Sequence, residues 1–266
     1  MSKIKIMSNR RRFLGQLGAG ASLVTLGGCD AFDGVLGLGH PALGFLRKAN
    51  ALTMGAQRAI QGPATMAREY PPSAIRQDQR PNGSTDPQTD DYLAVQKDDF
   101  AGYRLQVTGL VDKPLSLSLN ELRQMPSRTQ ITRHDCVEGW SCIAQWTGVQ
   151  LSRVLDRAGI KPAARYVVFH CYDSMDDTLG DDSTLYYESI DLISAYHPQT
   201  ILAYGLNGQT LPIANGAPLR VRIEQQLGYK MAKYIRAIEI VDSFAKIAGG
   251  NGGYWEDRGY DWYAGS

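Results

Sequence analysis

The chain has 266 residues, with 28 lysines and arginines against 27 aspartates and glutamates, 43% apolar residues and four cysteines. At about 100–200 residues per domain, this length predicts one large or two small domains whose core needs no disulfide bonds. The chain is too apolar for a disordered protein, has too few cysteines for a disulfide scaffold, and at a net charge of +1 gives no electrostatic case for nucleic-acid binding.

The first 29 residues have the features of an export signal. An arginine pair precedes an aromatic residue and a leucine between Asn9 and Leu14, and a charge-free apolar run continues to Gly28. That run is shorter than the ~20 apolar residues that a transmembrane helix needs. A basic start followed by a short apolar stretch is typical of a secretory signal, and the arginine pair indicates the twin-arginine type. We therefore expect export by a route that carries folded proteins, often with a cofactor already inserted.

The signal ends at a cysteine that we expect to carry lipid. The sequence Leu26-Gly27-Gly28-Cys29 resembles the lipobox of bacterial lipoproteins, in which small residues precede the modified cysteine. Several acyl chains on Cys29 would anchor the protein stably, whereas a single chain would be marginal. The predicted location is the periplasmic side of the cytoplasmic membrane. The alternative is a plain signal that contains a cysteine by chance.

The remaining sequence changes character along its length. Glycine-rich sequence and proline clusters around residues 70–72 and 81–87 are typical of a linker that wraps onto a domain. The predicted division is a signal at 1–29, a linker and lead-in at 30–90, a catalytic domain at 91–248, and an aromatic, glycine-rich tail at 249–266.

Within the domain, the first regular elements are a strand and a short helix. Tyr103, Leu105 and Val107 alternate with polar residues, as in a half-buried strand. Ser118 and Glu121 have the spacing of a capping box, which predicts a helix over residues 119–124.

The later elements continue this mixture of strands and short helices. A helix over 151–158 is expected to end at Gly159, and Asn207-Gly208 predicts a hairpin within 201–211. Further strands are expected at 130–134, 166–169, 219–223 and 234–241, and a further short helix at 189–192. The order of elements is that of an α+β fold, strand-rich with short helices, rather than a regular βαβ alternation.

Cys136 is the residue that first suggests chemistry. It lies at the end of a predicted strand, within His134-Asp135-Cys136-Val137-Glu138-Gly139-Trp140-Ser141. Such a cysteine is a nucleophile, a metal ligand or an inert buried thiol, and free cysteines are among the most buried residues. No paired Cys/His spacing accompanies it, which argues against a structural zinc site.

A second group of residues has the composition of an anion site. Asn215-Gly216-Ala217-Pro218-Leu219-Arg220 and Leu227-Gly228-Tyr229-Lys230-Met231-Ala232-Lys233 combine glycines with cationic side chains. Glycines allow a ligand to approach the backbone closely, and guanidinium and ammonium groups bind phosphate. The alternative is a turn followed by ordinary surface lysines.

These motifs together resemble the sulfite-oxidase superfamily. Cys136 to Ser141 is similar to the Cys-Val-Glu-Ala-Trp-Ser segment of the catalytic subunit of periplasmic protein-methionine-sulfoxide reductases. Asn215 to Arg220 resembles that family's Asn-Gly-Ala-Pro-Leu-Arg, and Gly228 to Lys233 its Gly-Phe-Lys-Ser-Ile-Lys. The resemblance covers about residues 100–244, with the motifs in the same order and at similar separations.

The resemblance implies a sulfite-oxidase-type molybdopterin-binding domain with one molybdenum and one pterin dithiolene. Cys136 would be the thiolate ligand of the metal, a soft donor suited to it. Glu138 would be the acid near the metal. The implied cofactor-binding residues are Tyr92, Leu93, Cys171, Asn215, Arg220, Met231, Ala232 and Lys233. Cys171 stands where the family has a threonine, and a thiol is the weaker hydrogen-bond donor.

Departures from the sulfite oxidases favour a different substrate. Val137 to Ser141 contains no arginine that would bind an anion, and instead carries Glu138 and Trp140. An acid repels sulfite, and an aromatic side chain suits a neutral or apolar molecule. We therefore expect oxygen-atom transfer or reduction of an S-oxide or N-oxide, methionine sulfoxide or a small molecule. The alternatives are sulfite-type oxidation, or a metal-free lipoprotein that keeps the fold as a binding module.

Electrons are expected to pass through a separate protein, since no Cys-x-x-Cys-His haem motif occurs and no additional Ig-like domain is expected after Phe244. With a lipid anchor, the expected partner is a membrane cytochrome b or a quinol-linked subunit. The aromatic tail is expected to pack onto the domain, with a docking patch as the alternative.

Three smaller features are left open or are expected to be structural. Cys142 and Cys171 could pair in an exported protein, although a position of Cys171 near the cofactor argues against it. His134 and His170 are expected to be structural more often than functional. The acidic residues at 173, 176, 177, 181 and 182 lack the order of an EF-hand, and a solvated loop is expected.

Overall fold

The computed structural model describes residues 49, 52–59, 62, 65–175 and 184–265. The predicted signal, Cys29 and the acidic residues at 176, 177, 181 and 182 lie outside these residues. Contacts between residues divide the chain after Asn50, and the second unit, from Ala51 onwards, contains the elements described below. In the described part of the chain, no helix combines the length and the apolar character needed to span a bilayer.

The first sheet has the strand order β2-β1-β10-β5-β6. Its strands are β1 (Arg104–Gly109), β2 (Leu115–Ser118), β5 (Tyr166–Ser174), β6 (Leu185–Asp191) and β10 (Ile235–Val241). β1 and β10 are parallel, with Gln106 opposite Ala237, and the other pairs are antiparallel. Inward-facing residues alternate with exposed ones along β1, as its sequence predicts.

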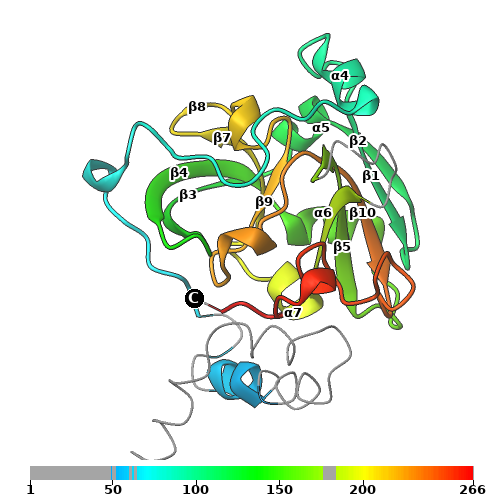
Figure 1. The fold of residues 1–266 in the computed structure, drawn as a ribbon. Helices are drawn as coiled ribbons and strands as arrows, with labels where there is room; N and C mark the ends of the chain where they lie inside the picture. The colour runs from blue at the N-terminus through cyan, green and yellow to red at the C-terminus, as the bar shows by residue number, and fades with distance from the viewer. Residues whose placement is uncertain (1–48, 50–51, 60–61, 63–64, 176–183, 266) are drawn as a thin grey trace, which may run out of the picture. The chain divides into compact units, whose positions relative to one another are not determined.

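The second sheet is built on a long hairpin. β3 (Ser127–Asp135) pairs with β4 (Ser141–Gln150), which pairs with β7 (Ile201–Leu206), and β7 pairs with both β8 (Gln209–Thr210) and β9 (Arg220–Arg222). The chain passes from this sheet to the first one between β9 and β10. Figure 1 shows this connection, in orange, between the two sheets.

Short helices begin and end where local chemistry places them. α5 (Leu119–Gln124) starts with a capping box between Ser118 and Glu121, and α6 (Leu151–Ala158) ends at Gly159, which has a positive φ of 71°. Further helical elements are α4 (Asp90–Gln96), α7 (Leu192–Ala195), the helical residues 52–59, and the short turns η1 (Pro72–Ala74), η3 (Ile213–Asn215), η4 (Gly228–Lys230) and η5 (Glu256–Arg258). The α+β class predicted from the sequence is confirmed.

The main hydrophobic core joins both halves of the fold. Its buried side chains come from strands of both sheets and from α5, α6 and α7. A smaller cluster around the fully buried Trp146 lies within the second sheet. The core fixes the ends of β3 and β5 and the connection after β9, where the candidate site forms.

One helix was predicted to begin too early, and three strands, β2, β4 and β6, were not predicted. Residues 189–191 continue β6, because Ser189 and Ile190 pair with Val168 and Val167 of β5. The helix begins only at Leu192, where the Asp191 side chain accepts the Ser194 amide at 2.9 Å. The strand β4, which the patterns did not predict, pairs along its length with β3.

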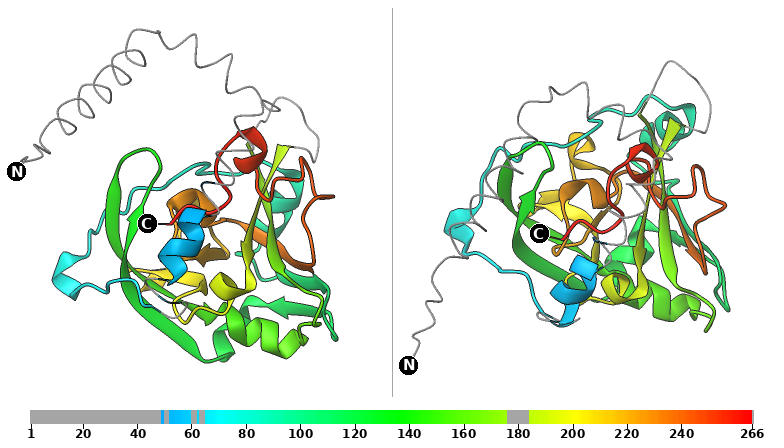
Figure 2. Two further views of the ribbon diagram at one scale, coloured as in Figure 1. Left: turned by 90° about the horizontal axis from the view of Figure 1, so that it is seen from below. Right: turned by 60° about the horizontal axis from the view of Figure 1, so that its bottom comes forward.

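The lead-in and the tail both lie along the domain. The Tyr70 amide donates to the Ile131 carbonyl and the Arg76 amide to the Ile143 carbonyl, each at 2.9 Å, so the lead-in follows the β3–β4 hairpin. The tail runs beside β6, where Gly253 pairs with Glu188. Figure 2 shows the tail, in red, from two further directions.

Candidate functional site

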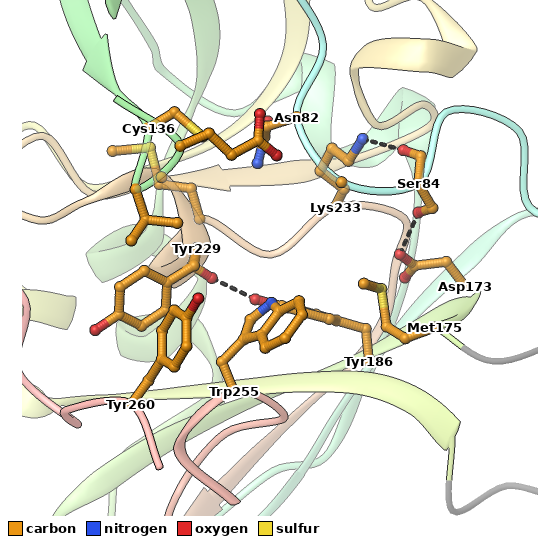
Figure 3. A pocket seen from close by; sticks show the side chains of 15 residues that line it. Asn82, Ser84, Cys136, Asp173, Met175, Tyr186, Tyr229, Lys233, Trp255 and Tyr260 are labelled. Carbon is orange, nitrogen blue, oxygen red and sulfur yellow. Dashed lines mark hydrogen bonds between the residues drawn. The ribbon is translucent and has the colours of Figure 1, made fainter. Parts of the chain in front are cut away.

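A cavity of about 290 Å³ lies where these segments meet. Its lining comes from the lead-in (Asn82, Gly83, Ser84), the β3–β4 turn (Cys136, Val137, Glu138), β5 and the segment after it (Asp173, Met175), β6 (Tyr186), the η4 region (Gly228, Tyr229, Met231, Lys233) and the tail (Trp255, Tyr260). Figure 3 shows two sides: polar groups around Lys233, Ser84 and Asp173, and aromatic rings below Cys136.

Cys136 lies at the tip of the β3–β4 hairpin. The Cys136 amide donates to the Trp140 carbonyl at 2.9 Å, and the Gly139 amide donates to the Cys136 carbonyl at 3.0 Å. Gly139 has a φ of 84°, which the turn requires and glycine allows. Cys136 is 8% exposed, and burial raises the pKa of its thiol. The turn thus presents a single sulfur to the cavity.

Glu138 stands at the exposed rim of the same turn. Its carboxylate accepts a hydrogen bond from Trp140 Nε1 at 2.9 Å and lies 3.7 Å from Arg80 of the lead-in. The Trp140 ring is covered by the Arg80 guanidinium and does not line the cavity. The expectation that Trp140 supplies an aromatic wall for the substrate is therefore wrong.

Lys233 brings a cation to the polar side. Its Nζ donates to the Ser84 carbonyl and, at 3.1 Å, to the Ala214 carbonyl. Burial, and then the positive charge of Arg220, lower the pKa of Lys233 to about 7. An anion bound there would favour the charged ammonium.

Asp173 faces Lys233 across the same side of the cavity. Its Oδ2 accepts from Ser84 Oγ at 2.6 Å, while Oδ1 is buried without a hydrogen-bond partner. Burial raises the pKa of Asp173 to about 6. The expectation of a solvated position is wrong for this residue, because Ser84 of the lead-in covers it.

Asn215 and Arg220 form the support behind Lys233. The Arg220 guanidinium donates to the carbonyls of Asn215 at 2.9 Å and Met231 at 3.4 Å, whereas its Nε and the Asn215 Nδ2 are buried and unpaired. Burial, and then the positive charge of Arg222, lower the pKa of Arg220 to about 9. Gly216, at a φ of 114°, lets this turn pack closely against the Lys233 side chain, because a Cβ there would lie 3.0 Å from Lys233.

The remaining predicted residues take varied positions. Met231 lines the cavity, and the buried Ala232 accepts the Val221 amide beside it. Tyr92 is buried and donates to the Ala217 carbonyl at 2.8 Å, which supports the Asn215 turn from outside. Leu93 is 40% exposed on α4.

Cys171 lies on β5 but does not line this cavity. It is a buried free thiol on β5, and it lines a second cavity together with His170 and Arg236. Cys142 is likewise a free, buried cysteine.

A buried network of charges sits behind the Cys136 turn. Arg222 donates to His134 Nδ1 at 2.8 Å and holds Glu224 through two hydrogen bonds. Since arginine only donates, Nδ1 accepts and the His134 proton resides on Nε2. That nitrogen faces Gly228, where a Cβ would come within 2.5 Å of it. Burial lowers the pKa of His134 well below its usual value, so the ring is neutral.

Sequence reasoning missed much of the cavity wall. Asn82 to Ser84 showed only turn-forming residues, and nothing local connects them with Lys233. Trp255 and Tyr260 were visible as tail aromatics, but their contact with the cavity was not predicted. The structure joins Cys136, Glu138, Met231 and Lys233 in one cavity, with Asn215 and Arg220 directly behind it.

This arrangement suits a soft metal beside a bound anion. A thiolate is a donor for soft metals, and the unpaired Arg220 Nε and Asn215 Nδ2, together with Lys233, are donors for a phosphate. In the part of the chain that the structure describes, no cluster of three His, Cys, Asp or Glu side chains forms a metal cage.

Comparison with known proteins agrees with this reading of the site. The family described as "Oxidoreductase molybdopterin binding domain" matches residues 92–246. The chain is 43% identical over 172 residues to the putative protein-methionine-sulfoxide reductase subunit YedZ1 of Azospira oryzae, across 65% of this chain and 59% of that protein. It is 36% identical over 172 residues to the protein-methionine-sulfoxide reductase catalytic subunit MsrP of Xanthomonas campestris, across 60% of this chain and 51% of the relative.

The matched region thus spans little more than half the length of these curated relatives. Among solved structures, the chain resembles the sulfane dehydrogenase SoxCD from Paracoccus pantotrophus, at a TM-score of 0.48 and 24% identity, over 54% of this chain and 39% of that one. The resemblance inferred from the three sequence motifs is confirmed by the family match.

Proposed function

Because this chain belongs to the family of molybdopterin-binding oxidoreductase domains, we propose that it reduces an S-oxide or N-oxide, with methionine sulfoxide as the first substrate class to test. The observation that carries the proposal is the cavity that brings together Cys136, the buried Lys233 and aromatic rings. The relatives named as protein-methionine-sulfoxide reductases support the same substrate class.

The residues present fit the cofactor. Cys136 would hold the molybdenum through its sulfur, and Arg220, Lys233 and Asn215 would hold the phosphate, relieving the repulsion between two buried cations. Met231, Ala232 and Tyr92 would shape or support the pterin site, whereas Cys171 lines a different cavity. When bound, the cofactor supplies two-electron oxygen-atom transfer, and the protein orients it and controls access.

Charge at the cavity favours a neutral substrate. Glu138 and Asp173 both line it, and the β3–β4 turn contributes no arginine. Carboxylates repel a sulfite dianion, whereas an S-oxide carries no net charge. Sulfite and methionine sulfoxide turnover should therefore be measured side by side, and faster turnover of sulfite would overturn the assignment.

The reaction needs protons as well as electrons. Reduction of an S-oxide to a sulfide and water consumes two electrons and two protons. The electrons would come from a membrane cytochrome b or a quinol-linked subunit.

Export and anchoring belong to the same proposal. The arginine pair before Phe13 and the lipobox ending at Cys29 support twin-arginine export and a lipid anchor on the periplasmic side of the membrane. Replacing Cys29 with serine should release the protein from the membrane fraction. Retention of the C29S protein there would contradict the anchor.

Metal analysis of protein exported through its own signal tests the function. We expect about one molybdenum and one pterin per chain. The C136S variant should lose activity and change the metal spectrum. C142S is the matched control, because Cys142 is also a buried free thiol of the same hairpin but does not line the cavity.

Two results would contradict the proposal. The first is the absence of molybdenum from wild-type protein in cells that load other molybdoenzymes, which would favour a metal-free binding module. The second is a C136S protein with unchanged metal spectrum and turnover.

A further inference from the structure

The tail is built into the domain rather than laid over it. The Tyr254 amide donates to the Tyr187 carbonyl at 3.0 Å, Trp262 Nε1 donates to Ser189 Oγ at 2.8 Å, and the Leu227 amide donates to the Ala264 carbonyl at 2.8 Å. These contacts join the tail to β6 on one side and to the η4 region on the other.

A buried group of charges fixes the tail more firmly. Lys230 of η4 donates to Glu188 of β6 and, at 2.5 Å, to Glu256 of the tail, and all three side chains are buried. Gly253 makes room for this cluster, since a Cβ there would lie 2.0 Å from Glu256 Oε2. The position of the tail is thereby tied to the turn that carries Tyr229.

This position of the tail brings three aromatic rings together, those of Tyr229, Trp255 and Tyr260. Tyr229 and Tyr260 meet edge to face, with centroids 5.3 Å apart, and Tyr260 stacks on Trp255, also at 5.3 Å. All three line the cavity, and Figure 3 shows them on the side away from Asp173, with Cys136 above Tyr229. The aromatic side therefore remains for a substrate if the polar side holds the cofactor.

We propose that Trp255 and Tyr260 of the tail determine substrate specificity, by packing against the aliphatic arm of a thioether S-oxide. Aromatic rings attract sulfur and its attached methyl and methylene groups. A methionyl sulfoxide side chain presents such an arm, whereas dimethyl sulfoxide does not extend beyond two methyl groups. This inference rests on the proposed function and names the residues that select its substrate.

The test compares two substrates in the full-length, cofactor-loaded protein. In W255A and Y260A, we expect the KM for N-acetylmethionine sulfoxide to rise about tenfold, with kcat and the kcat/KM for dimethyl sulfoxide changing less than about threefold. W255F should recover most of the loss, because a ring is restored. Y263A is the control, since Tyr263 is a tail aromatic that does not line the cavity.

Binding provides a readout that needs no turnover. Quenching of tryptophan fluorescence by N-acetylmethionine sulfoxide should saturate in wild type. The Kd obtained from this titration should rise about tenfold in Y260A. Molybdenum content should be unchanged in every variant. Equal losses for both substrates, or an unchanged KM, would overturn the role of the tail while leaving the proposed function intact. Saturable binding without any S-oxide turnover would overturn the proposed function instead.

Discussion

Lys230 and Lys233 lie close together in the chain but in opposite surroundings. Lys230 is fully buried between two carboxylates, Glu188 and Glu256. Lys233 is 5% exposed and donates to the backbone carbonyls of Ser84 and Ala214. One segment therefore anchors the tail with a compensated charge and presents a less compensated charge to the cavity.

The contrast separates what holds the fold from what holds a ligand. When a buried charge has ionic partners, removing one member of the group destabilises the fold, because an uncompensated charge stays buried. A buried charge that lacks a full partner has a shifted pKa, as Lys233 does through burial and the neighbouring Arg220. The first kind of site should fail by unfolding, and the second by losing its ligand.

The largest expected effect comes from removing the charge of Lys230, which is compensated by two carboxylates. K230M leaves Glu188 and Glu256 buried and facing each other, and we expect a loss of about 3–5 kcal/mol in the free energy of unfolding. Chemical denaturation of cofactor-free protein measures it. K246M changes an exposed lysine and should cost less than about 0.5 kcal/mol. A K230M protein as stable as wild type would contradict the anchoring role of the cluster.

An intermediate effect concerns the carboxyl group that faces Lys233. The pKa of Asp173 is about 6 when folded, against an ordinary 3.8. Between these values the folded state binds more protons than the unfolded state, so this group lowers stability as pH rises from about 4 to about 6, by up to about 3 kcal/mol. D173N should remove that contribution.

Denaturation of the cofactor-free protein at several pH values checks the slope. D242N provides the control, since Asp242 is exposed. Identical pH profiles for wild type and D173N would show that Asp173 does not titrate in this range.

Sequence alone predicted those parts of the site that are local in the chain. Cys136 was identifiable because a strand end, a turn and an acid follow one another within a few residues. Arg220 and Lys233 were identifiable because glycines and cations recur over two short segments. In each case the chemistry and the backbone requirement lie side by side in the sequence.

The other parts depend on contacts between distant residues. Ser84 covers Asp173 across 89 positions and meets Lys233 across 149. No periodicity records such a contact, so an acidic residue in an acidic run was predicted to be solvated. Likewise, residues 189–191 were predicted to be helical, and pairing with β5 made them a strand. Tertiary pairing overrode local preference there.

The smallest expected effect concerns Lys233, whose charge lacks a full ionic partner. K233M removes a donor for the phosphate, and we expect retention of molybdenum and pterin after dialysis to weaken about tenfold, or about 1.4 kcal/mol. The free energy of unfolding of cofactor-free protein should not fall, because methionine avoids the cost of burying an ammonium group. Cofactor analysis and denaturation of the same preparations separate the two quantities. A K233M protein that unfolds like K230M, yet keeps its cofactor, would reverse the roles assigned to the two lysines.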